Sequence, residues 1–120
     1  MDLEVPMDFG TWGEEVACRH LQGKGYEILE RNFRCRTGEL DIVARIGNTI
    51  CFVEVKSRKG MTTGLPSEAV TKEKQQHLRS AALFYLYSHP QKKNEFLRMD
   101  VIEILRIQDK TYLRHIENAF

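Results

Sequence analysis

The sequence predicts an α/β protein in which two helices flank a mixed β-sheet, in the order α-β-β-β-α-β-β. Two stretches have apolar residues at helical spacing, one near the start and one in the middle of the chain. Between and after them lie runs of β-branched residues that are typical of strands. With 120 residues the chain is long enough for a single hydrophobic core, so we expect residues 1–120 to form one domain.

The first helix is expected over residues 9–25, after a loose leader of residues 1–8. Its apolar spacing is helical up to the breaker sequence "GKG". Glu14 falls on the apolar side of this helix, whereas Glu15 lies one turn before Arg19 and is placed for an exposed ion pair. We therefore expect Glu14 to face the core side and Glu15 to face water.

Three strands are expected next, over residues 26–33, 39–46 and 49–57. The basic loop "RCRTG" separates the first two. Gly47 and Asn48 form a two-residue turn between the second and the third, because both residues tolerate the positive φ that such hairpin turns need.

After a loop of Gly, Thr and Pro, Ser67 is expected to cap a second helix that runs to Ser88. The buried stripe of this helix is expected to be Leu78, Ala81, Ala82, Tyr85 and Leu86. Residues 96–107 and 111–117 are the last two strands. Asp100 falls on an apolar face of the first of these, so we expect a structural acid with a hydrogen-bonded partner.

Composition and cysteine usage limit the class of protein. Hydrophobic residues make up 42% and charged residues 29%, and no stretch approaches membrane-spanning length. No membrane partner is expected, and the cytoplasm is the expected location. Cys18, Cys35 and Cys51 lack CxxC spacing, so we expect reduced thiols. The formal net charge is +1, so a nucleic-acid surface would have to be a local patch.

The hairpin turn predicts a pairing register. If Gly47 and Asn48 are the loop, Asp41 lies directly opposite Glu54 and Glu39 lies opposite Lys56. Side chains alternate with period two, so all four project from one side of the sheet. Two like charges directly across a ladder are unfavourable, which raises the question of what holds them there.

Two interpretations account for these charges. A divalent cation between the carboxylates would remove the repulsion, and oxygen-only ligands without His or Cys suit Mg²⁺ or Mn²⁺. Alternatively, Lys56 pairs with Glu39 and Asp41 accepts backbone hydrogen bonds in the preceding loop, with no metal involved. Spacing alone does not separate these interpretations.

Four motifs carry a resemblance to a known family. The pattern D-x12-E-x-K with an upstream helical acid resembles the PD-(D/E)xK nuclease superfamily, the restriction-endonuclease-like fold. More closely, "GTWGEEVACRHLQGKGY", "NFRCRTGELDIVA", "FVEVKSR" and "RMDVIEI" together resemble the bacterial YraN family, which is uncharacterised and is usually compared with archaeal Holliday-junction resolvases. The match extends from Gly10 to about Ile104. Leu40 stands where the motif name has Pro, a proline that resolvase-like branches often lack.

This resemblance implies a restriction-endonuclease-like (tRNA-endonuclease-like) fold and a set of site residues. Asp41 and Glu54 would be metal ligands, the backbone carbonyl of Val55 a further ligand, and Lys56 the motif lysine. Glu14 matches the helix acid that completes such sites in resolvase-like members. The fold is a firmer implication than the activity, because one fold hosts many functions.

The implied activity is Mg²⁺- or Mn²⁺-dependent hydrolysis of phosphodiester bonds in structured or branched DNA, by a monomer or a homodimer. The metal would activate a water and stabilise charge on the phosphate. Lys56 would either orient or deprotonate that water or stabilise the transition state as a compact positive charge. The sequence leaves both roles open.

Basic residues near these motifs are candidates for a phosphate track: Arg34, Arg36, Arg58, Lys59, Lys72 and Lys74. Alternatively, each cluster is a solvated loop. No base-reading motif is present, so structure-selective binding is the expectation. DNA and RNA are not distinguished. A nucleic-acid-binding module that keeps the fold without catalysis, and a protein-interaction adaptor, are the rival functions.

Overall fold

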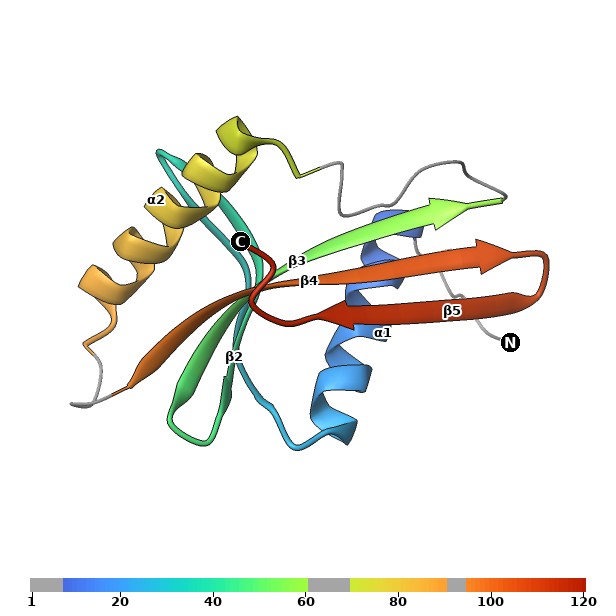
Figure 1. Ribbon diagram of the computed structural model, residues 1–120, viewed down its shortest axis with the longest axis horizontal. Helices are drawn as coiled ribbons and strands as arrows, with labels where there is room; N and C mark the ends of the chain where they lie inside the picture. Colours follow the sequence, from blue (N-terminus) through green and yellow to red (C-terminus); the bar gives the residue numbers. More distant parts are fainter. Residues whose placement is uncertain (1–7, 61–69, 91–94) are drawn as a thin grey trace, which may run out of the picture.

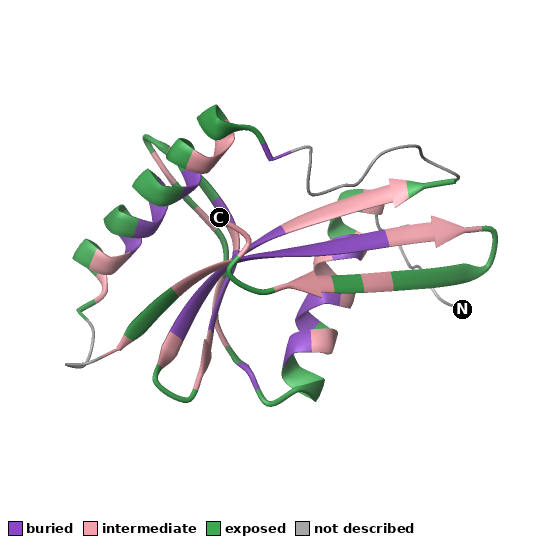
Figure 2. Cartoon of the chain, in the orientation of Figure 1, coloured by how far each residue is buried: buried purple, intermediate pink, exposed green. Residues whose placement is uncertain are grey.

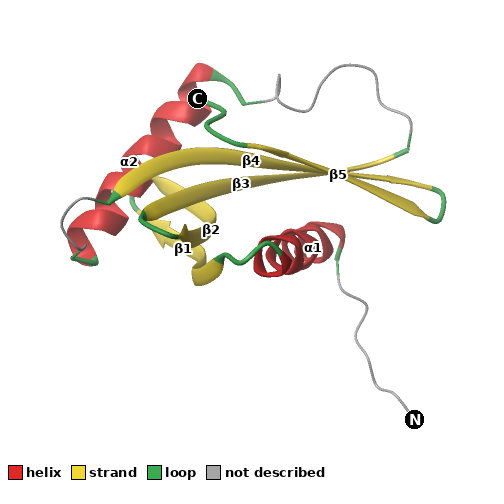
Figure 3. Ribbon diagram, turned by 60° about the horizontal axis from the view of Figure 1, so that its bottom comes forward, coloured by secondary structure: helices red, strands yellow, loops and turns green. Residues whose placement is uncertain are grey.

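The computed structural model describes residues 8–60, 70–90 and 95–120, which form a five-stranded sheet with a helix on each face (Figures 1 and 3). The elements are α1 (Phe9–Gly23), β1 (Glu27–Cys35), β2 (Gly38–Ile46), β3 (Thr49–Lys59), α2 (Lys72–Ser88), β4 (Phe96–Ile107) and β5 (Lys110–Ile116). The predicted α/β class and element order are confirmed, and the mixed sheet flanked by helices is consistent with a restriction-endonuclease-like fold.

The strands lie side by side in chain order, β1-β2-β3-β4-β5. Only β3 and β4 are parallel, and the other three pairs are antiparallel. A parallel pair needs a crossover connection, and α2 lies within that connection. The crossover places α2 over one face of the sheet and leaves α1 on the other (Figure 3).

The first helix ends earlier than predicted. The N–H of Tyr26 donates to the carbonyl of Leu21 at 2.9 Å, and Gly25 takes a φ of 92°, so the chain turns out of the helix after Gly23. At the other end Asp8, assigned from the sequence to the loose leader, caps the helix by accepting the N–H of Thr11 at 2.8 Å. Residues 1–7 of that leader lie outside the described residues.

Glu15 forms the predicted ion pair with Arg19, with Nε and Oε1 3.3 Å apart. A second ion pair at 3.1 Å joins Glu15 to Arg31 of β1.

The predicted basic loop is shorter in the structure, because the ladder between β1 and β2 continues to the pair Cys35 and Gly38. The start of α2 also differs from the prediction. The helix begins at Lys72, and Thr71 is its cap, with the hydroxyl accepting the N–H of Lys74 at 3.1 Å. Threonine supplies the same capping oxygen as serine. Ser67, the predicted cap, lies outside the described residues.

The core has two layers, one on each face of the sheet. The α1 side contains Ala17, Cys18, Leu21, Tyr26, Ile42, Ala44, Cys51, Val53, Ile102 and Ile104. The α2 side contains Leu40, Val43, Ile50, Phe52, Val70, Leu78, Ala81, Ala82, Tyr85 and Val101. Four of the five residues predicted for the buried stripe of α2 are buried, and the fifth, Leu86, packs against the same cluster. On β3 the odd-numbered residues therefore face α1 and the even-numbered residues face α2.

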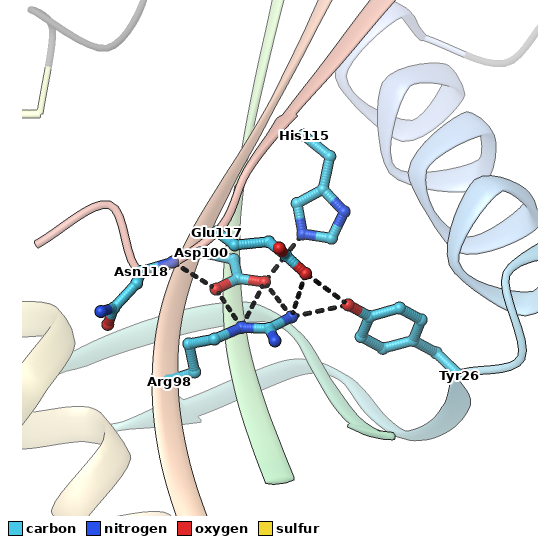
Figure 4. A network of polar contacts seen from close by, with 6 residues as sticks. All are labelled: Tyr26, Arg98, Asp100, His115, Glu117 and Asn118. Atoms are coloured by element: carbon cyan, nitrogen blue, oxygen red, sulfur yellow. Dashed lines mark hydrogen bonds and ion pairs between the residues drawn. The ribbon is translucent and has the colours of Figure 1, made fainter. Parts of the chain in front are cut away.

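Asp100 is a structural acid, as predicted, and lies in a polar network on the α1 side (Figure 4). Its carboxylate accepts hydrogen bonds from Nε of Arg98 at 2.9 Å, from Nε2 of His115 at 2.7 Å and from the N–H of Asn118 at 3.0 Å. Arg98 also donates to the hydroxyl of Tyr26 at 2.6 Å. Burial alone would raise the pKa of Asp100, but these hydrogen bonds lower it below its usual value. The network joins the start of β1, the middle of β4 and the end of β5.

All three cysteines are free, in agreement with the predicted reduced thiols. Across the three described ranges, neither helix combines the length and the apolar character that a bilayer crossing requires.

Candidate active site

The hairpin between β2 and β3 has the predicted register. Ile46 pairs with Thr49 across the turn, and pairing continues outward until Ile42 meets Val53. The ladder ends at that pair, one step before Asp41 would meet Glu54. The direct cross-strand pairs predicted beyond this point are therefore wrong, although the register that leads to them is right.

Asp41 lies where the two strands part. Its Oδ2 accepts the backbone N–H of Val55 at 2.8 Å, so a side chain replaces a ladder partner at this position. The backbone hydrogen bond considered from the sequence is thus present, but its donor is on β3 and not in the loop before β2. We refer to Asp41 and Glu54 as the acidic pair.

Strand β2 rotates about its axis at Asp41. Leu40 and Val43 both pack on the α2 side, whereas Ile42 packs on the α1 side. Strict alternation would put Leu40 and Ile42 on the same face. On β1, Asn32 stands between residues that pair with Ile42 and Leu40 and has a φ of 54°, a conformation rare within strands. The β2–β3 ladder ends at the same place, and the carboxylate of Asp41 bonds there to the backbone of β3.

Glu54 is buried on the α2 side, and its two oxygens have different surroundings. The side chain is 7% exposed, and Oε1 lies 3.7 Å from Nζ of Lys56 and 3.8 Å from Nζ of Lys74. Oε2 is buried and has no hydrogen-bond partner in the part of the chain that the structure describes. Lys56 therefore pairs with Glu54. The metal-free interpretation, which paired Lys56 with Glu39, is wrong on this point. A buried carboxylate oxygen without a partner is costly, and an ordered water or a bound cation would satisfy it.

The acidic pair resists ionising as two carboxylates. Burial and the neighbouring charge of Glu54 raise the pKa of Asp41 from 3.8 to about 7, although the hydrogen bond from Val55 opposes this. Burial also raises the pKa of Glu54, against the attraction of Lys74 and Lys56. A divalent cation between the carboxylates would favour their charged forms.

Glu14 approaches the acidic pair from α1. Its charge contributes to the raised pKa of Asp41. With the amide of Asn32 oriented as a donor, its nitrogen lies 3.1 and 3.2 Å from the two carboxylate oxygens of Glu14. The helix can come this close because Gly13 has no side chain. A Cβ at this position would collide with Oγ of Ser57 and lie 3.0 Å from its Cβ. The structure thus brings the predicted helix acid to the site and gives it a partner.

The donor set suits a hard cation with an incomplete protein shell. Among the described residues, no three His, Cys, Asp or Glu side chains are grouped to hold a metal on their own. The acidic pair supplies two carboxylates, and further oxygen ligands would come from backbone, water or substrate. Mg²⁺ commonly binds through one or two carboxylates, several waters and phosphate oxygens. Val55 is held beside Asp41 by its amide, and its carbonyl as a ligand stays a prediction.

Two of the predicted basic residues lie at the tip of the β1–β2 hairpin. Arg34 and Arg36 line an open hollow of ≈ 590 Å³ next to His77 of α2. The tip packs tightly on α2, since a Cβ at Gly38 would lie 3.0 Å from the carbonyl oxygen of His77. Arg34 also lies 3.6 Å from Glu39, which therefore pairs across β1 and β2 rather than with the motif lysine.

The other four predicted basic residues divide between the two faces. Lys72 and Lys74 begin α2, and Lys74 reaches the acidic pair. Arg58 faces the α2 side of β3, as its even number requires. Lys59 faces the other way, with its ammonium 4.8 Å from the centroid of the Phe9 ring. The structure therefore places Lys74 beside the acidic pair and Arg58 farther along the same face of β3, and it separates Lys59 from them.

Two contacts of the site were missed from the sequence. Lys74 was assigned to phosphate binding alone, and its ion pair with Glu54 depends on how α2 docks, which no local pattern shows. Asn32 was not singled out, yet it carried a signal: asparagine is depleted in strands and tolerates the left-handed conformation that it adopts here.

Comparison with known proteins gives the family. The sequence pattern of "Uncharacterised protein family UPF0102" matches residues 13–104. A UPF0102 protein of Syntrophomonas wolfei is 48% identical over 113 residues, which cover 94% of this chain and 97% of that protein. A UPF0102 protein of Caldicellulosiruptor saccharolyticus is 45% identical over 115 residues, with 94% and 97% covered. The predicted membership of the YraN family is thereby confirmed, and the chain belongs to the uncharacterised protein family UPF0102.

Proposed function

We propose that this protein is a cytoplasmic, metal-dependent endonuclease that hydrolyses phosphodiester bonds in structured or branched DNA. The observation that supports this best is the acidic pair, in which Oε2 of Glu54 is buried without a partner among the described residues and burial raises the pKa of Asp41 to about 7. Such an arrangement opposes stability, and perturbed groups of this kind cluster at functional sites. The names of the relatives give no activity, so the proposal depends on the site.

In this proposal the acidic pair and the carbonyl of Val55 hold Mg²⁺ or Mn²⁺. The metal would supply an activated water and neutralise charge that develops on the phosphate. Asp41 keeps its orientation through the hydrogen bond from Val55, so its second oxygen is available to the metal. Glu14, held by Asn32, would bind a water of the metal's shell.

Lys56 and Lys74 would act on the substrate side of Glu54. Both ammonium groups lie within 4 Å of Oε1, which leaves Oε2 for the metal. As a compact charge, Lys56 would stabilise the phosphate in the transition state or orient the attacking water. Lys74 would add a second positive charge from the first turn of α2.

A second candidate is a nucleic-acid-binding module without catalysis. The two lysines at Oε1 of Glu54 favour it, because they partly neutralise this acid without any metal. Under this function the basic residues near the acidic pair would bind phosphates, and binding would weaken as salt increases.

Cleavage assays with junction, flap and single-stranded DNA in Mg²⁺ or Mn²⁺ test the proposal. We expect the wild type to cut at least one structured substrate and Asp41→Asn and Glu54→Gln to abolish cutting. Glu27→Gln is the control, since Glu27 is an exposed acid at the start of β1 whose charge is not among the causes that shift the pKa of Asp41 or Glu54. Cleavage that persists in both acidic-pair variants would refute the assignment. Salt-sensitive binding without any cleavage would instead identify the non-catalytic module.

A further inference from the structure

The face of the sheet that carries Glu54 continues past α2. In Figures 1 and 3, α2 covers the part of the sheet next to β1 and β2, while β3, β4 and β5 extend beyond it. The strand register sets two rows of side chains across this extension. Lys56 is in register with Glu103 of β4, which is in register with Arg114 of β5.

The next row outward contains Arg58, Leu105 and Tyr112. Val101 and Ile116 precede these rows on the same strands and pack in the α2-side cluster, which assigns both rows to that side. We call Arg58, Tyr112 and Arg114 the extension triad.

Arg114 is anchored by a buried acid. Its Nε and Nη2 lie 3.0 and 2.8 Å from Oε2 of Glu103, whose side chain is 7% exposed, while the side chain of Arg114 is 52% exposed. A guanidinium has five donors, so one hydrogen bond and one ion-pair contact to Glu103 leave others for a ligand on this half-exposed side chain. An arginine held in this way loses little conformational freedom when it binds a phosphate.

The other two members of the triad are available to a partner. No described residue makes an ion pair with Arg58, and Tyr112 is 52% exposed. Figure 2 shows that β5 is exposed over most of its length. Arginine and tyrosine on one face of a sheet match a sugar–phosphate backbone, with one binding the anion and the other stacking on a base or sugar.

The opposite face of the same strands differs. There Lys59 lies 4.8 Å from the centroid of the Phe9 ring and Arg106 lies 5.3 Å from that of Trp12. These cations are engaged with aromatic rings of α1. Of the two described faces, the α2 side therefore carries basic groups that are available to a ligand, and the same face contains Glu54 of the acidic pair.

We infer that the extension triad binds the backbone of the nucleic acid whose scissile phosphate lies at the acidic pair, one or more nucleotides away from it. The inference rests on the proposed function and adds a binding surface to it. It assigns Glu103 as a positioning residue that holds Arg114.

Equilibrium binding measures this surface separately from catalysis. Fluorescence anisotropy with a labelled duplex and a labelled four-way junction, in EDTA, compares the wild type with Arg58→Gln/Tyr112→Ser and with Glu103→Gln/Arg114→Gln. The second variant removes both charges of the buried pair, so no buried carboxylate is left unpaired. Lys59→Gln is the matched control, because Lys59 adjoins Arg58 in sequence but faces α1. Circular dichroism verifies that each variant is folded.

We expect each double variant to weaken binding several-fold and to reduce the slope of log affinity against log salt by about one for each phosphate that the variant no longer binds. Lys59→Gln should bind as the wild type does. Unchanged affinity and slope in both folded double variants, with a wild type that binds, would overturn the triad and leave the proposed function intact. A wild type that binds no nucleic acid even at low salt would overturn both the triad and the proposed function. If the wild type cleaves DNA while both double variants bind as it does, only the triad is overturned.

Discussion

The carboxylate of Asp41 is joined to β3 by a hydrogen bond of 2.8 Å from the N–H of Val55, immediately beyond the last ladder pair of the β2–β3 hairpin. The bond fixes the acid at the point where the strands separate. It also keeps Asp41 close to Glu54, whose charge is one cause of the raised pKa of Asp41. The geometry of the site therefore disfavours the ionised form of the Asp41 carboxyl group.

Asp41→Asn should stabilise the protein at neutral and alkaline pH in the absence of divalent cations. The pKa of Asp41 is about 7 in the folded state and near 3.8 when unfolded, so the folded state binds more protons between these values. Stability therefore rises as pH falls from about 7 to 4, and the penalty is greatest above that window. Asparagine keeps an oxygen to accept the Val55 bond. We expect a gain of roughly 1–3 kcal/mol at about pH 8 that disappears near pH 4.

Denaturant unfolding of both proteins across this pH range measures the gain. A loss of stability that is equal at all pH values would contradict the raised pKa.

Mn²⁺ should raise the melting temperature of the wild type but not of Glu54→Gln. A ligand that binds only the folded state stabilises it by about 2.7 kcal/mol at a concentration one hundred times its Kd. Thermal unfolding with increasing Mn²⁺, without nucleic acid, measures this effect independently of cleavage. Glu27→Gln, at an exposed acid at the start of β1, should respond as the wild type does. An identical response of Glu54→Gln and the wild type would place any bound metal elsewhere.

Gly13→Ala should destabilise the protein although alanine favours helix. The helical preference is worth about 1 kcal/mol, whereas overpacking costs typically 1–3 kcal/mol, and the new Cβ would collide with Ser57. Gly23→Ala is the control, since nothing lies within 4 Å of a Cβ there. Ser57→Gly should partly rescue Gly13→Ala in thermal or denaturant unfolding. Additive effects of the two substitutions would mean that α1 does not pack on Ser57 as described.

Asn32→Gly and Asn32→Ala should separate the two roles of this asparagine. Glycine accepts the φ of 54° but lacks the amide that reaches Glu14. Alanine lacks the amide too, and its Cβ disfavours this φ. We expect both variants to lose cleavage activity, and only Asn32→Ala to lose roughly 1 kcal/mol or more of stability. Cleavage assays and unfolding of the same preparations give the two readouts. Full activity in Asn32→Gly would show that the amide does not position Glu14.

Much of the architecture could be read from local pattern. Periodicity of two or 3.6 residues and the Gly47-Asn48 turn depend only on neighbouring residues, so they predicted the element order and the register as far as Ile42 and Val53. The same alternation would have separated Arg58 from Lys59, which the prediction of a single basic track did not use. The family motifs directed attention to Asp41, Glu54 and Lys56.

The sequence by itself thus determined the α/β order and the hairpin, because these are encoded in short-range spacing, and its family motifs supplied the candidate site residues. Only the tertiary structure decided that the ladder ends before the acidic pair, that Asn32 meets Glu14 and that Lys74 meets Glu54. The two contacts each join a helix to a strand of the sheet, and the ladder ends where β2 departs from regular alternation. Their geometry is set by the packing of both helices on a twisted sheet, and that packing has no counterpart in the spacing of neighbouring residues.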